Sequence, residues 1–276
     1  DRYCNRTTFS QDVNGAVMNS TPTVSQNTNR FTSTDFGYDK NGNVITDKDP
    51  ITSLPRHFIF NGDNRQIEIT SNGVSVGSYS YDGEGKRVKK VVGSETTVFV
   101  YSAGKLIAEY STTAPPATGH VNYTTTDHLG SPRIITDEVG QVTSRRDFMP
   151  YGEELQPNVG NRSANTEYAT GDQVRQKFTG YQKDEETKLD FAEARMYENR
   201  HGRFTAVDPL LASGKSANPQ TFNRYAYTSN NPIIRVDRNG KDWYVTYEPG
   251  TDGRWYKVPR WYDEKRWSSS AWGSSS

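Results

Sequence analysis

The fold is decided by a stretch that occurs more than once, Tyr79-Ser80-Tyr81-Asp82-Gly83-Glu84-Gly85-Lys86-Arg87-Val88. An earlier copy reads Phe36-Gly37-Tyr38-Asp39-Lys40-Asn41-Gly42-Asn43-Val44-Ile45. Both copies have an aromatic residue, any residue, Tyr, Asp, two residues and Gly, followed by the start of a strand. Alternate side chains of a strand share one face, so the two rings lie together. The Asp carboxylate accepts backbone N–H groups and Gly adopts φ > 0, so each copy predicts a strand, a tight turn and a second strand.

Weaker copies of this pattern continue along the chain. They are Phe58-Ile59-Phe60-Asn61-Gly62-Asp63-Asn64-Arg65-Gln66-Ile67, Phe99-Val100-Tyr101-Ser102-Ala103-Gly104-Lys105-Leu106 and Thr126-Asp127-His128-Leu129-Gly130. The positions equivalent to Asp are therefore 39, 61, 82, 102 and 127. A spacing of about 21 residues fits two strands of about 5 to 7 residues with two turns. The sequence therefore predicts an all-β fold in which each repeat is a hairpin.

Composition excludes several classes of function. The 33 basic and 33 acidic residues balance, so no overall field favours nucleic acid, and 17 tyrosines oppose a disordered chain. The single cysteine, Cys4, excludes an internal disulfide framework, and we expect neither a metal nor a cofactor. No apolar run approaches the roughly 18 residues of a membrane-spanning helix. Because the start lacks both a methionine and an export signal, we expect a piece of a longer precursor.

A second set of motifs carries a resemblance to a known family. They occur in the order Asp127-His128-Leu129-Gly130-Ser131-Pro132-Arg133, Asp147-Phe148-Met149-Pro150-Tyr151-Gly152-Glu153, Phe178-Thr179-Gly180-Tyr181, Leu189-Asp190-Phe191-Ala192-Glu193-Ala194-Arg195-Met196-Tyr197, Gly202-Arg203-Phe204-Thr205-Ala206-Val207-Asp208-Pro209 and Asn223-Arg224-Tyr225-Ala226-Tyr227-Thr228-Ser229-Asn230-Asn231-Pro232. With the repeats, they resemble the C-terminal part of RHS/YD-repeat proteins, including the RHS-associated core domain.

This resemblance implies a spiralling strand shell, closed by the core domain as a plug and containing little helix. It implies a structural scaffold of a secreted or cell-surface protein that encloses or presents a C-terminal polypeptide, as in polymorphic-toxin delivery. The implied partners are the upstream shell of the same precursor and the enclosed peptide.

Four regions follow from the motifs and the composition. We expect an irregular lead-in over 1–35, YD repeats over 36–120, the RHS-associated core over 121–241 and a variable tail over 242–276. All five tryptophans lie in this tail, which is too short for a toxin enzyme. An alternative function is a carbohydrate- or partner-binding surface that uses Trp255, Tyr256, Trp261 and Tyr262 as stacking platforms.

The enzymatic alternative is self-cleavage by a pair of aspartates. Family members resemble aspartic proteases in pairing the aspartates of two Asp-Pro-x-Gly motifs, and the matching positions here are Asp208 and Asp237. The first motif has Leu211 in place of Gly, and the second has Arg238 in place of Pro. The predicted cleavage point is at or near the Lys241–Asp242 bond. The alternative is that both aspartates have ordinary turn roles.

Three further expectations concern local structure. His128 lies in a turn and is expected to be structural. Pro219 to Ser229 favours a short helix, because Asn218 can cap it and Pro occupies its first position. Lys183 to Tyr197 is compatible with helix or strand, and its alternation from Leu189 favours strand.

Overall fold

The computed structural model describes residues 5, 9–13, 16–20, 23–113, 121–155, 157–163, 167–168, 174–209, 219–241, 243–245, 248–249 and 255–256. Eight antiparallel strands, paired in sequence order, form what we call the repeat sheet. They are β3 (Gly37–Tyr38), β4 (Val44–Lys48), β5 (Pro55–Phe60), β6 (Gln66–Ser71), β7 (Val74–Tyr81), β8 (Arg87–Val92), β9 (Glu95–Ser102) and β10 (Lys105–Ser111).

Smaller antiparallel sheets complete the fold. The four-stranded one, here called the core sheet, contains β14 (Gln182–Asp184), β15 (Leu189–Ala192), β16 (Arg195–Glu198) and β17 (Arg203–Phe204). A three-stranded sheet contains β11 (Tyr123–Thr126), β12 (Pro132–Thr136) and β13 (Val142–Arg145). The remaining pairs are β1 (Phe9–Val13) with β2 (Ala16–Ser20), β18 (Arg235–Asp237) with β19 (Trp243–Val245), and β20 (Glu248–Pro249) with β21 (Trp255–Tyr256).

One turn geometry joins the two strands of most of the predicted hairpins and accounts for the repeat. In residues 39–43, 61–65, 82–86 and 127–131, the first residue's N–H donates to the carbonyl of the fifth, and its side-chain oxygen accepts from the N–H of the fifth. Residues 137–141 form the same turn, which the repeat pattern had not included. The copy at Ser102 differs, because Ala103 and Gly104 both have positive φ and form a two-residue hairpin turn instead.

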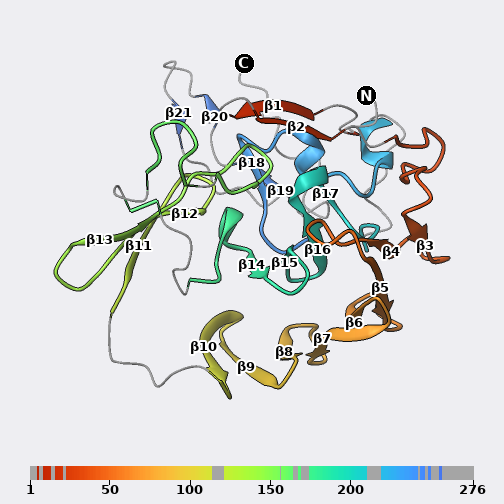
Figure 1. Cartoon of the computed structure of the whole chain (residues 1–276), viewed down its shortest axis with the longest axis horizontal. Helices are drawn as coiled ribbons and strands as arrows, with labels where there is room; N and C mark the ends of the chain where they lie inside the picture. Colours follow the sequence, from red (N-terminus) through yellow and green to blue (C-terminus); the bar gives the residue numbers. More distant parts are fainter. Residues whose placement is uncertain are drawn as a thin grey trace, which may run out of the picture.

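The repeat sheet bends around the core sheet, as the orange-to-yellow and teal strands show in Figure 1. A shared cluster of buried side chains lies between them. Its members from the repeat sheet are Val44, Phe58, Ile69 and Tyr79, and those from the core sheet are Leu189, Phe191 and Met196. Full burial of one such side chain contributes about 1.5 to 3 kcal/mol.

A second cluster of buried side chains, mainly aromatic, lies within residues 121–241, here called the core segment. It consists of Leu129, Phe178, Tyr181, Ala192, Tyr197, Phe204, Tyr227 and Val236. The ring centroids of Tyr197 and Tyr227 are 4.7 Å apart. The Tyr197 hydroxyl donates to the Tyr151 carbonyl over 2.8 Å, so this ring fills the core while its polar end is satisfied.

Buried ion pairs also connect the two sheets. Arg87 and Asp184 are each about 1% exposed, and Arg87 Nη1 lies 2.5 Å from Asp184 Oδ2. The guanidinium carbon of Arg87 lies 4.0 Å from the centre of the Phe191 ring. Arg56 Nε donates to Asp47 Oδ1 over 2.7 Å, and Arg56 Nη1 donates to the Thr187 carbonyl over 2.5 Å. Because these charges have left water, each depends on its partner in the other strand or sheet.

The prediction of an all-β fold with little helix is confirmed, and the described residues contain no α-helix. The helix expected over Pro219 to Ser229 is wrong, because that segment has only two 3₁₀ turns, Pro219–Phe222 and Thr228–Asn230. Two others are Phe178–Gly180 and Asn199–His201. The ambiguous run from Lys183 forms strands β14, β15 and β16, in agreement with the strand interpretation.

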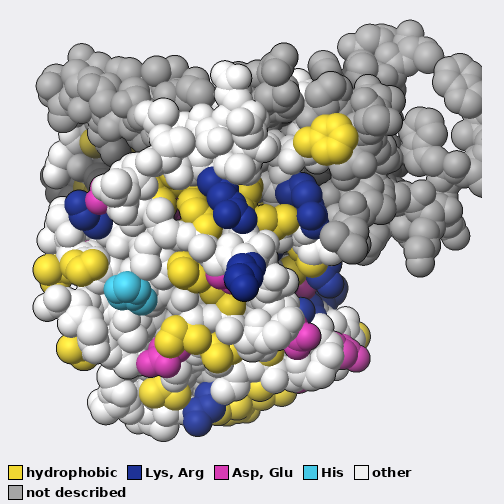
Figure 2. Space-filling view, turned by 90° about the vertical axis from the view of Figure 1, so that its right-hand side faces the viewer, with side chains coloured by type: hydrophobic (Ala, Val, Ile, Leu, Met, Phe, Trp, Pro, Cys, Tyr) yellow, Lys and Arg dark blue, Asp and Glu magenta, His cyan; other side chains and the backbone are white. Residues whose placement is uncertain are grey.

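The surface mixes charges of both signs. On the face drawn in Figure 2, Lys and Arg side chains are interspersed with acidic and apolar ones. Among the described residues, no helix is long and apolar enough to cross a membrane.

Candidate functional site

Asp208 follows β17 in a segment that is hydrogen-bonded to the chain at Arg224. Its N–H donates to the Arg224 carbonyl over 3.0 Å, and its own carbonyl accepts from Arg224 Nη2. Its side chain is 13% exposed. The backbone around Asp208 is therefore fixed while the carboxylate faces a largely dry interior.

Asp237 ends β18 and is 3% exposed. Its Oδ1 accepts from the Lys241 N–H over 3.2 Å, and its carbonyl accepts from the Tyr181 hydroxyl. The chain then turns through Gly240, whose φ is 69°. An added Cβ there would lie 2.4 Å from the Ala192 carbonyl oxygen, so this turn needs glycine for both conformation and space.

Arg195 brings the two aspartates together. Its Nη2 lies 3.3 Å from Asp237 Oδ2 and 3.9 Å from Asp208 Oδ2. Its Nε donates to the Gly240 carbonyl over 2.5 Å, and its guanidinium carbon lies 3.6 Å from the centre of the Phe204 ring. The predicted pair therefore converges on one buried cation, although the two residues are distant in sequence.

The electrostatics favour a proton on Asp237. Burial raises the pKa of Asp237 to about 7, while Arg195 opposes this rise and the negative charge of Asp208 adds to it. Two nearby carboxylates do not both ionise readily in a dry site, so one retains a proton near neutral pH. One protonated and one ionised carboxyl is the chemical requirement for general acid–base hydrolysis.

The predicted cleavage point adjoins this pair. The Lys241 N–H donates to Asp237 Oδ1 and, over 3.0 Å, to Asn239 Oδ1. Asp242, on the other side of the predicted bond, lies outside the described residues, as does Leu211. Self-cleavage therefore stays a prediction.

The tail has fewer described features. The backbone of Trp255 and Tyr256 forms β21, whereas Trp261 and Tyr262 lie outside the described residues. Carbohydrate or partner binding by these rings stays a prediction. The division into 1–35, 36–120, 121–241 and 242–276 likewise stays a prediction.

Two residues complete the account of the site. His128 Nε2 lies 2.7 Å from the Ile233 carbonyl oxygen, which ties the beginning of the core segment to its end. Arg195 occurs within one of the family-like motifs and in the strand alternation from Leu189, but the sequence alone assigned it no role at the site. Among the residues that the structure describes, no group of three or more His, Cys, Asp or Glu side chains could hold a metal ion.

Fold and site together define a class of protein, a segment of a repeat-built β-shell with a buried aspartate pair near the end of its core. The profile of the Teneurin YD-shell family matches residues 117–233. The tRNA nuclease WapA of Bacillus subtilis (strain 168) is 26% identical over 263 residues, which cover 87% of this chain and 10% of WapA. The double-stranded DNA deaminase toxin A of Burkholderia cenocepacia (strain H111) is 25% identical over 248 residues, which cover 73% of this chain and 16% of the toxin.

A solved structure shows the same fold. The crystal structure of TcdB2-TccC3-Cdc42 superposes with a TM-score of 0.63 at 19% identity, over 87% of this chain and 13% of that one. These matches support the predicted resemblance of this chain to RHS/YD-repeat proteins. It spans between a tenth and a sixth of the length of the two curated relatives above.

Proposed function

We propose that this segment closes the C-terminal end of a secreted or cell-surface β-shell that encloses or presents the polypeptide following it, as in toxin delivery. The carrying observation is the repeat sheet bent around the core sheet, with Arg87 and Asp184 paired in the buried layer between them. Such a layer, together with the apolar cluster beside it, holds the curved repeat sheet against the core sheet. The remaining shell strands of the same protein would be its immediate partners.

The names of the relatives support a carrier role. One is a tRNA nuclease and another a double-stranded DNA deaminase toxin, and this segment corresponds to 10% and 16% of them respectively. A segment shared by proteins of different activity is better suited to delivery than to either reaction.

Protease protection tests the shell in the full-length protein. We expect the C-terminal polypeptide to resist limited proteolysis in the wild type and to become sensitive in Asp184→Asn, which leaves the buried Arg87 without its charged partner. Lys89→Ala, an exposed change on β8, is the matched control and should preserve protection. Equal digestion of the C-terminal polypeptide in wild type and Asp184→Asn would contradict enclosure.

A second candidate function, self-cleavage, is favoured by the convergence of Asp208 and Asp237 on Arg195. In this reaction the protonated carboxyl of Asp237 donates to the scissile carbonyl, and ionised Asp208 takes a proton from the attacking water. The C–N bond at or near Lys241–Asp242 then breaks, which leaves a carboxyl group on one product and an amine on the other. Arg195, whose Nη2 lies 3.3 Å from Asp237 Oδ2 and 3.9 Å from Asp208 Oδ2, would orient both carboxyl groups.

Intact-mass spectrometry of the full-length protein tests this reaction. We expect Asp208→Asn and Asp237→Asn each to abolish cleavage, because an amide can neither accept the proton from water nor share one with its partner. Cleavage should slow as the pH rises above about 7, where Asp237 loses its proton. A wild type that stays uncut would assign turn roles to both residues, and unchanged cleavage in both variants would indicate a contaminating protease.

A further inference from the structure

The turn between β15 and β16, residues 192–195, lies between the repeat sheet and the aspartate pair. It begins at Ala192, passes through Glu193 with a φ of 56°, and ends at Arg195, the residue that contacts both aspartates. Any displacement of this turn would move the guanidinium of Arg195. The contacts that hold the turn therefore matter for the candidate reaction.

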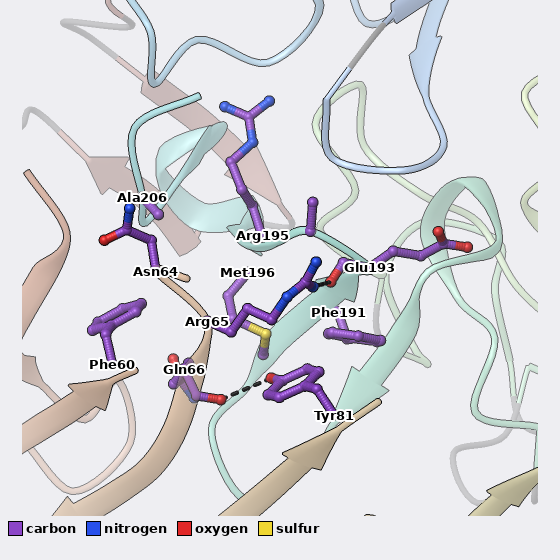
Figure 3. Close-up of a pocket in the computed structure, with 11 residues that line it drawn as sticks. Phe60, Asn64, Arg65, Gln66, Tyr81, Phe191, Glu193, Arg195, Met196 and Ala206 are labelled. Atoms are coloured by element: carbon purple, nitrogen blue, oxygen red, sulfur yellow. Dashed lines mark hydrogen bonds between the residues drawn. The ribbon is translucent and has the colours of Figure 1, made fainter. Parts of the chain in front are cut away.

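Two repeat turns hold it from one side. Lys86, in the turn 82–86, places Nζ 2.7 Å from Glu193 Oε2. Arg65, in the turn 61–65, donates from Nη1 to the Gly85 carbonyl over 2.7 Å and reaches the Glu193 carbonyl oxygen at 3.4 Å. Figure 3 shows Arg65 extended between Tyr81 and Glu193, with its contact to Glu193 drawn as a dashed line.

The path of Arg65 depends on a glycine in the neighbouring repeat. A Cβ added to Gly85 would lie 1.8 Å from Arg65 Nη2, so the guanidinium crosses where a side chain would otherwise stand. The guanidinium carbon also lies 5.5 Å from the centre of the Tyr81 ring. Arg65 therefore connects two successive repeats to the core turn.

The segment that leads to the predicted cleavage point holds the same turn from the other side. The Ala194 N–H donates to the Asn239 carbonyl over 3.1 Å, and Arg195 Nε donates to the Gly240 carbonyl over 2.5 Å. The turn 192–195 is thus in contact with the repeats on one side and with residues 239–240 on the other.

We propose that Arg65 and Lys86 are positioning residues for self-cleavage. They hold the turn 192–195 where Arg195 reaches both carboxylates and where Asn239 and Gly240 are fixed beside the predicted bond. This inference rests on the proposed self-cleavage. It assigns a part of that reaction to side chains of the YD repeats, more than 100 residues before the aspartates in sequence.

A charge swap in the full-length protein tests the Lys86 contact. We expect Lys86→Glu and Glu193→Lys each to slow cleavage about fivefold, because repulsion replaces a partly exposed ion pair. The double variant should return to within about twofold of the wild-type rate, since it restores attraction with reversed signs. Lys89→Glu makes the same charge change at an exposed position of the next strand, and it should cut at the wild-type rate.

Arg65 is tested through the pH profile. Arg65→Lys keeps the charge but loses the planar guanidinium that lies over the Tyr81 ring and brings Nη1 within reach of both the Gly85 and Glu193 carbonyl groups, so cleavage should slow and its alkaline limb should shift. A change of rate without any shift in pH profile, with an unchanged melting temperature, would count against positioning. Wild-type rates in both Lys86→Glu and Glu193→Lys, or slow singles with no rescue in the double variant, would overturn the Lys86 assignment.

Failure of self-cleavage itself remains distinguishable. If the wild type does not cut, the proposed reaction is wrong. The position of the turn can then be tested by the pH dependence of unfolding, because the pKa of Asp237 in the folded state is higher than in the unfolded state. A shifted midpoint in Glu193→Lys, but not in Lys89→Glu, would support the positioning of Arg195. An unchanged midpoint in both would overturn it.

Discussion

At the scale of single residues, the interior contains carboxyl groups whose pKa values are shifted in opposite directions. Burial raises the pKa of Asp190 to about 7, and Lys183 only partly opposes that rise. Glu198 is also buried, but the charge and hydrogen bonds of Arg200 outweigh its burial and lower its pKa to about 2. The difference follows from geometry, because Arg200 Nη2 lies 2.7 Å from Glu198 whereas Lys183 Nζ lies 3.6 Å from Asp190.

These shifts predict how stability depends on pH. An aspartate in the unfolded chain has a pKa of about 3.9, so between about pH 4 and 7 the folded state binds more protons at Asp190 and Asp237. Their contribution is therefore complete at low pH and is lost as the pH rises through about 7. We expect the free energy of unfolding to fall by up to about 1.4 kcal/mol per pH unit for each carboxyl near pH 5 to 7.

Urea unfolding at several pH values between 5 and 8 measures this dependence. Asp190→Asn should flatten the slope and raise stability at pH 8, while exposed Asp63→Asn should leave the slope unchanged. Stability that rises steadily from pH 5 to 8 in the wild type would contradict the assignment.

At the scale of elements, the repeated turn explains why the strands follow one another at regular spacing. In the turn 82–86 the Asp82 carboxylate accepts from the N–H groups of Glu84 and Lys86, and Gly85 has a φ of 82°. The same turn holds Arg65 above Gly85. A local conformational demand and a contact between repeats therefore coincide at one glycine.

Two glycines of this turn should respond differently to alanine. Gly85→Ala meets both a positive φ and the guanidinium of Arg65, and we expect it to lower the free energy of unfolding by about 1 to 3 kcal/mol. Gly83→Ala is the matched control, since nothing lies within 4 Å of an added Cβ there, and its effect should stay within about 0.5 kcal/mol. Equal effects in chemical denaturation would refute the turn as the cause.

At the scale of the whole molecule, the repeat sheet and the core sheet share both apolar and charged contacts. The Tyr79 hydroxyl donates to Glu186 over 2.8 Å, and Lys90 Nζ lies 3.2 Å from Asp184 Oδ1. These polar contacts border the apolar cluster that contains Ile69 and Phe191. Separation of the two sheets would expose the shared apolar cluster and break these ion pairs together, which favours cooperative unfolding of both.

A double-mutant cycle tests this coupling. Asp184→Leu alone should cost about 3 to 5 kcal/mol, because it leaves the buried cation of Arg87 unpaired. Arg87→Met should also be costly, whereas the double variant should cost less than the sum of the two, since the buried charges are removed together. Additive effects in denaturation would show that the pair does not couple the sheets.

The sequence by itself determined the hairpins, their turns and the all-β class, because strand alternation and the Asp-x-x-Gly turn depend on residues close together in the chain. It also singled out Asp208 and Asp237 through the family resemblance. Only the tertiary structure placed Arg195 between them and put Lys86 beside Glu193. It likewise decided that the segment from Pro219 to Ser229 forms short 3₁₀ turns and not the predicted helix. Such features depend on contacts between distant segments and on burial, which set the direction of a buried side chain and its pKa, and no local pattern encodes them.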